Sequence, residues 1–106
     1  MGGAVSRADP TNTAFYHRDA AFSLTALSAW LDPAEDEKNM AWARDLSDHL
    51  QPYTSGGVYV NELGDEGEER IRAAYGPATY DRLVALKNKH DPTNLFRLNQ
   101  NIKPIV

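Results

Sequence analysis

Proline and glycine divide this chain into short segments, and this division limits its fold more than any other feature of the sequence. Asp32-Pro33 is typical of a helix start, because aspartate caps free backbone N–H groups and proline suits the first helical position. Pro52, Gly76-Pro77 and Asp91-Pro92 each mark a point where a helix ends. The chain is therefore interpreted as several short elements joined by turns.

Three helices are predicted between these breaks. The first begins at Asp32-Pro33, carries acidic residues in its first turn, where the helix dipole favours them, and ends at Pro52. At the start of the second, Asp65 and Glu68 resemble a capping box in which aspartate replaces serine or threonine. The third helix ends near His90.

Three further segments, residues 2–5, 14–30 and 56–61, are predicted as strands. In residues 14–30 both alternating faces are apolar, which favours a mostly buried strand. A helix is the alternative there, because alanine and leucine are common in the segment. The whole order predicts an α+β fold, with a small antiparallel sheet of about three strands packed with about three helices. One domain is predicted over residues 1–106, because single domains commonly have about 100–150 residues.

Composition excludes several classes of function. The formal net charge of −4 argues against general affinity for nucleic acid. With no cysteine, the chain cannot form disulfides, thiolate metal sites or a cysteine nucleophile. The three histidines lie far apart without ligand spacing, so we expect no metal. The sequence shows neither a membrane span of about 20 apolar residues nor a secretory pattern, and a cytoplasmic location is expected.

The charges are unevenly distributed along the chain. Eleven of the 15 acidic side chains lie between residues 32 and 70, whereas residues 82–106 hold five basic side chains and one acidic one. Two solvated faces of opposite sign explain this pattern, and a basic surface that meets an anionic partner is the alternative.

Residues 56–104 carry three patterns in a fixed order: Gly-Gly-Val-Tyr-Val-Asn, then Ala-Ala-Tyr-Gly, then Asp-Pro-Thr-Asn-Leu-Phe-Arg-Leu-Asn-Gln-Asn-Ile. Each pattern is weak alone, but together they make a specific signature. The stretch resembles the C-terminal segment of the berberine-bridge-enzyme-like family of FAD-linked oxidases. Residues 2–33 are also similar to bacterial members, so the resemblance covers nearly the whole chain.

The resemblance implies a piece of a larger enzyme. Family members carry an N-terminal FAD-binding domain, and the residues that attach FAD covalently lie upstream of anything present here. The chain also has no glycine-rich phosphate loop. We therefore expect part of an alcohol- or sugar-type oxidase that passes hydride to FAD, inactive alone, binding no FAD by itself and completed by a chain with an FAD-binding domain.

Candidate site residues follow from the resemblance and from side-chain chemistry. Tyr59 is the predicted catalytic residue, because the family tyrosine at this position helps to remove a proton from a substrate hydroxyl; a structural tyrosine on a strand is the alternative. His17 and Arg18 are predicted to bind substrate, with an ordinary strand histidine as the alternative for His17. The resemblance implies that the tail packs near the cofactor domain, and uncharged amides suit a flavin ring edge, so four cofactor-binding residues are predicted: Asn61, Asn99, Gln100 and Asn101. A tail whose amides hydrogen-bond to its own sheet is the alternative for residues 99–101.

Two other functions compete with an oxidase fragment. One is an interaction module without catalysis, which forms a homodimer through exposed sheet edges. The other is a pocket that binds a flavin or an aromatic compound non-covalently, although the missing phosphate loop argues against it.

Overall fold

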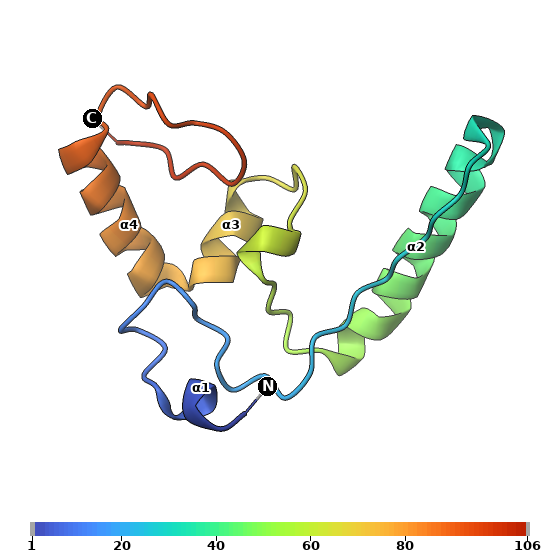
Figure 1. The fold of residues 1–106 in the computed structure, drawn as a ribbon, viewed down its shortest axis with the longest axis horizontal. Coiled ribbons are helices and arrows are strands. Elements are labelled where there is room, and N and C mark those ends of the chain that lie inside the picture. The colour runs from blue at the N-terminus through green and yellow to red at the C-terminus, as the bar shows by residue number, and fades with distance from the viewer. Residues whose placement is uncertain (1, 106) are drawn as a thin grey trace. The chain divides into compact units, whose positions relative to one another are not determined.

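The computed structural model describes residues 2–105 and is built from helices (Figure 1). Over these residues no strand is formed, so the predicted α+β fold with a sheet of about three strands is wrong. The α-helices are α1 (Ala4–Arg7), α2 (Asp36–Leu50), α3 (Glu68–Tyr75) and α4 (Pro77–His90). Single 3-10 turns span Pro33–Glu35, Gln51–Tyr53 and Val60–Glu62.

Each predicted strand has another conformation. Residues 2–5 lead into the single helical turn α1, and residues 14–30 are largely irregular. The segment 56–61 is extended at Tyr59, with φ −88° and ψ 124°, and then enters the 3-10 turn Val60–Glu62. A strand needs a second strand for its backbone N–H and C=O groups, and the described residues bring no such pair together. The described residues offer no sheet edge for a homodimer, and the homodimer itself stays a prediction.

The helix predictions are confirmed at three of their signals. The Asp32 carboxylate accepts a hydrogen bond from the Ala34 backbone N–H at 2.9 Å, at the start of the turn that leads into α2. Gly76 separates α3 from α4, and α4 ends at His90, just before Asp91. The capping box is wrong: the N-cap of α3 is Gly67, at φ 88°, with no side-chain cap. Local backbone geometry at a glycine replaces the expected side-chain cap there.

The chain divides into two compact units. The first holds the residues up to Ala21 together with those from Gly57 onward. Its core lies where α3 and α4 pack together, and the buried hydrophobic residues are Leu63, Ala74, Tyr80 and Val84. At the surface of this pair, Arg72 forms an ion pair with Asp81 at 2.9 Å.

The second unit, Phe22–Gly56, contains an irregular chain that precedes α2 and runs beside it (Figure 1), together with α2 and the 3-10 turns at its two ends. Half-buried side chains alternate with exposed ones here: the Trp30 Nε1–H donates to Asp36, and the Ser28 hydroxyl donates to Asn39 at 3.2 Å. Leu27 is 78% exposed and Leu31 fully exposed. The prediction of a mostly buried strand is wrong, because no second layer covers the outer face within this unit.

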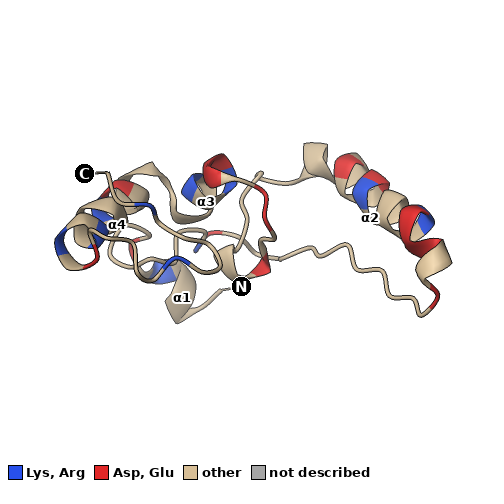
Figure 2. Ribbon diagram, turned by 90° about the horizontal axis from the view of Figure 1, so that it is seen from above, with Lys and Arg blue, Asp and Glu red and all other residues tan. Residues whose placement is uncertain are grey.

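On α2, acidic residues lie toward both ends of the helix and the basic residues lie between them (Figure 2). Asp36 and Glu37 occupy the first turn, as the sequence predicts, and His49 lies in the last. None of the helices in the described part of the chain is long and apolar enough to cross a membrane. The prediction of one domain over residues 1–106 stays a prediction.

Candidate functional site

Tyr59 and Asn61 lie together in the structure. The Asn61 Nδ2–H donates to the Tyr59 hydroxyl oxygen at 2.7 Å. The 3-10 turn Val60–Glu62, and not a strand face, makes this contact possible. Because the oxygen accepts from Asn61, the phenol O–H can point to another acceptor, and Tyr59 is 44% exposed. The pair therefore presents a hydroxyl of fixed orientation.

Arg18 lies one aromatic ring away from Tyr59. The Phe15 ring packs edge-on against the Tyr59 ring, with 5.7 Å between centroids, and the Arg18 guanidinium stands 5.3 Å from the Phe15 centroid. The guanidinium also donates to the Val5 carbonyl at 3.2 Å and to the Thr13 hydroxyl. Its Nε is buried without a hydrogen-bond partner. Arg18 is thus close to the predicted catalytic tyrosine, but its guanidinium is engaged with its own chain.

His17 contacts two other parts of the first unit. Its Nε2 lies 3.2 Å from the Ala73 carbonyl oxygen, which can only accept, so Nε2 carries the proton in this bond. The ring also lies against Gly57, where an added Cβ would come within 2.6 Å of Nδ1. The His17 imidazole is thus hydrogen-bonded to the protein itself. That His17 binds substrate stays a prediction.

The amides of the tail gather elsewhere in the first unit. The Gln100 side chain donates to the Leu63 carbonyl, and Asn99 has a left-handed backbone with φ 57°. These residues border an open pocket of about 450 Å³, lined by Gly64, Asp65, Gly67, Glu68, Ile71, Asn99, Gln100, Asn101 and Lys103. Tyr59 and Asn61 are not among the lining residues, so this pocket brings together three of the four predicted cofactor-binding residues and does not include Asn61.

The residues of this pocket fit one part of FAD and not another. The Asn101 Oδ1 atom is buried without a hydrogen-bond partner, which suits an N–H group at the edge of a flavin ring. A diphosphate is a poor match, since Asp65 and Glu68 are acidic and the one lining cation, Lys103, lies 3.5 Å from Glu68. Within the described residues, moreover, no three histidine, aspartate or glutamate side chains gather as a metal site would require.

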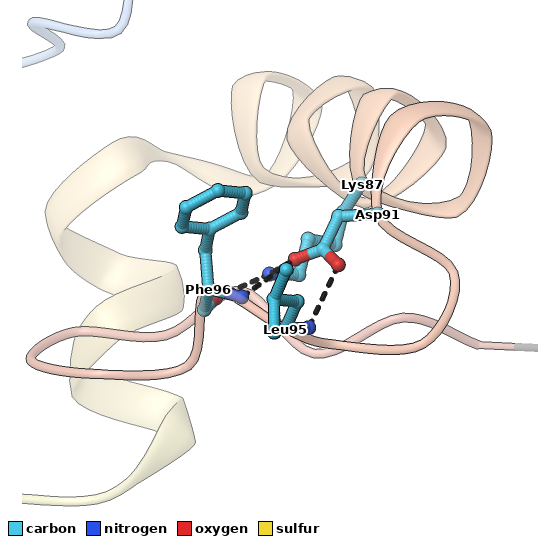
Figure 3. Close-up of polar contacts among 4 residues, drawn as sticks. All are labelled: Lys87, Asp91, Leu95 and Phe96. Carbon is cyan, nitrogen blue, oxygen red and sulfur yellow. Dashed lines mark hydrogen bonds and ion pairs between the residues drawn. The ribbon is translucent and has the colours of Figure 1, made fainter.

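The sequence analysis missed an ionic contact that fixes the start of the tail (Figure 3). Asp91 accepts hydrogen bonds from the backbone N–H groups of Leu95 at 2.7 Å and Phe96 at 3.1 Å. The Lys87 ammonium donates both to Asp91 and to the Phe96 carbonyl, each at 2.5 Å. We call this arrangement of Lys87, Asp91, Leu95 and Phe96 the Asp91 clamp. It orders the chain that leads to the tail amides.

The surroundings of the clamp explain its electrostatics. The side chains of Lys87 and Asp91 are only 12% and 11% exposed. The hydrogen bond from Lys87 holds the pKa of Asp91 below its usual value against the opposing effect of burial, and the two backbone N–H groups act in the same direction as Lys87. The i,i+4 spacing of lysine and aspartate was a usable signal in the sequence. From the sequence, Asp91-Pro92 predicts only the end of a helix.

Comparison with known proteins connects these features. Residues 58–103 match the family described as berberine and berberine like. These residues belong to the berberine-like family. The matched stretch contains Tyr59, Asn61, the Asp91 clamp and the tail amides. The predicted resemblance to this family is confirmed.

Relatives of the berberine-like segment extend the similarity to nearly the whole chain. The FAD-linked oxidoreductase YgaK of Bacillus subtilis is 38% identical over 105 residues, which is 99% of this chain and 23% of YgaK. The (R)-6-hydroxynicotine oxidase of Paenarthrobacter nicotinovorans is 37% identical over 91% of this chain and 22% of its own length. The aclacinomycin-N/aclacinomycin-A oxidase of Streptomyces galilaeus is 30% identical over 97% of this chain and 22% of its own length. The chain thus spans less than a quarter of these relatives.

Proposed function

We propose that this chain is the C-terminal part of an FAD-dependent oxidoreductase that oxidises an alcohol- or sugar-type substrate. Similarity to FAD-linked oxidoreductases over 99% of the chain carries the proposal. A bound flavin would supply the acceptor for a hydride from the substrate C–H, and a base would take the proton of the substrate hydroxyl, which would leave a carbonyl. Tyr59 is the residue that we assign as this base.

The geometry around Tyr59 supports this role. The Asn61 Nδ2–H donates to the Tyr59 hydroxyl oxygen at 2.7 Å and so orients the end of the side chain that would meet a substrate. The Phe15 ring, edge-on at 5.7 Å, limits the positions that the Tyr59 ring can take. The exposed hydroxyl end can meet a substrate that is held by another part of the enzyme.

The isolated chain is expected to be inactive. It spans 23% of YgaK, and its pocket residues fit the edge of a flavin ring but not the diphosphate. A visible absorption spectrum of the purified, desalted chain tests this expectation. Flavin bands at a stoichiometric level would show a complete cofactor site within these 106 residues and would refute this part of the proposal.

The role of Tyr59 is tested in an assembled enzyme. The chain is joined to the preceding portion of YgaK, and Tyr59→Phe is compared with Tyr53→Phe, a tyrosine that is 86% exposed. Loss of a general base lowers the turnover by about 10²–10⁴-fold. We expect that loss for Tyr59→Phe and unchanged turnover for Tyr53→Phe. Full activity of Tyr59→Phe would remove Tyr59 from the reaction.

A further inference from the structure

We propose that residues 15–18 form a positioning element for Tyr59, in which His17 is the central positioning residue and not a substrate ligand. The catalytic role of Tyr59 rests on the proposed function. The contacts by which residues 15–18 hold Tyr59 in place do not depend on it. Within residues 2–105 no sheet holds the segment that carries Tyr59, so contacts with other parts of the chain must fix its place.

All four side chains of residues 15–18 have partners. Phe15 packs on the Tyr59 ring and Arg18 stands over Phe15. Tyr16 lies against Gly76, where an added Cβ would come within 2.6 Å of the Tyr16 ring. The Tyr16 and His17 rings pack edge-on, 5.1 Å apart at an angle of 79°. Residues 15–18 lie outside any helix, and these side-chain contacts hold them against the rest of the first unit.

His17 contacts both the segment that carries Tyr59 and the end of α3. On one side its ring covers Gly57, two residues before Tyr59. On the other side its Nε2–H donates to the carbonyl of Ala73. Ala73 lies in the last turn of α3, where backbone carbonyls have no partner within the helix. One imidazole therefore satisfies a free carbonyl of α3 and sets the distance between α3 and the chain that carries Tyr59.

Gly57 is the residue that makes this contact possible. A Cβ at Gly57 would lie 2.6 Å from Nδ1, 2.7 Å from Cε1 and 3.1 Å from Cγ of His17. The ring cannot swing aside without breaking the bond to Ala73. A methyl group at position 57 must then displace the segment 57–61, and Tyr59 with it. Gly64 offers a matched control, because nothing lies within 4 Å of a Cβ added there.

The test uses the full chain and four variants: Gly57→Ala, His17→Ala, the double variant and Gly64→Ala. NMR follows the Tyr59 ring resonances and the nuclear Overhauser cross peak between the Phe15 and Tyr59 rings. This readout reports the position of one side chain and does not require flavin or turnover. It can therefore succeed or fail independently of the proposed oxidase function.

We expect Gly57→Ala to shift the Tyr59 resonances and to lose the cross peak, and Gly64→Ala to change neither. In the His17→Ala background, Gly57→Ala should cause no further shift, because the ring that transmits its effect is absent. Equal shifts from Gly57→Ala with and without His17, or no shift at all, would overturn the proposal. If His17→Ala does not fold, His17→Gln, which keeps an N–H donor for Ala73 but lacks the ring, takes its place in the cycle.

Discussion

Tyr80 is the most informative position for testing the core of the first unit. Its side chain is 3% exposed, which makes it the most completely buried of the four core residues. Its hydroxyl donates to Glu68 at 3.1 Å, and the Arg72 guanidinium stands 5.0 Å from its ring. Two substitutions separate these contributions: Tyr80→Phe removes only the hydroxyl, and Tyr80→Ala removes the ring as well.

The expected magnitudes follow from burial. Replacing a buried aromatic residue by alanine costs about 3–5 kcal/mol of the free energy of unfolding. The hydrogen bond alone contributes about 1 kcal/mol, because Glu68 is half exposed and water competes for its carboxylate. Domains have about 5–15 kcal/mol in total. Tyr80→Ala should therefore remove much of the stability of a unit whose core holds only four hydrophobic residues among those described.

Urea denaturation measures this loss, followed by circular dichroism and by the NMR amide signals of α3 and α4. With a slope of about 1–3 kcal/mol per molar urea, a loss of about 3 kcal/mol lowers the midpoint by about 1–3 M. Tyr53→Ala and Tyr53→Phe are the matched controls, because Tyr53 is 86% exposed. Equal midpoints for Tyr80→Ala and Tyr53→Ala would refute the assignment of the core to the packing of α3 on α4.

Three further outcomes are expected from substitutions at Asp91 and Asp32. In Asp91→Asn the charged partner of Lys87 is lost, so the amide protons of Leu95 and Phe96 should exchange faster in NMR. The pKa of Asp91 is lowered in the folded state, so its carboxylate contributes to the stability of the fold above about pH 3.9. This contribution is lost as the pH falls through the lowered pKa. An acid titration of Asp91→Asn should therefore lack this loss of stability. Asp32→Ala removes the cap on Ala34 and should cost about 0.5–2 kcal/mol, seen as fraying of the first turn before α2, whereas unchanged NMR signals there would contradict the cap.

The helices could be predicted because their signals are local. Asp32 caps an N–H two residues away, and the glycine and proline at positions 76 and 77 act on the backbone at their own positions. The strands could not be predicted correctly in the same way. The alternation in residues 14–30 shows which side chains share a face, but it does not show whether a second strand lies beside them. The predicted sheet therefore rested on partners that the described chain does not supply.

The same distinction applies to the candidate site. Tyr59 and Asn61 are two residues apart, and their association was predictable from the sequence, although through a strand and not a turn. The contacts of His17 with Gly57 and Ala73 span far greater separations, and only the paired glycines at 56 and 57 hinted at a close approach there. The ion pair of the Asp91 clamp could have been predicted from the sequence, since a lysine and an aspartate four residues apart at a helix end commonly form such a pair.

The chain order of the two units has a consequence for loop entropy. His17 and Ala73 are 56 positions apart, and the whole second unit lies between them. The second unit contributes none of the four buried hydrophobic residues, so its length matters to the first unit mainly through the entropy of closing that loop. Each doubling of loop length costs only about 0.6 kcal/mol. Insertions and deletions between positions 22 and 56 should therefore be tolerated far more readily than at Gly57 or in α3, where a single added methyl group meets a packed ring or the core.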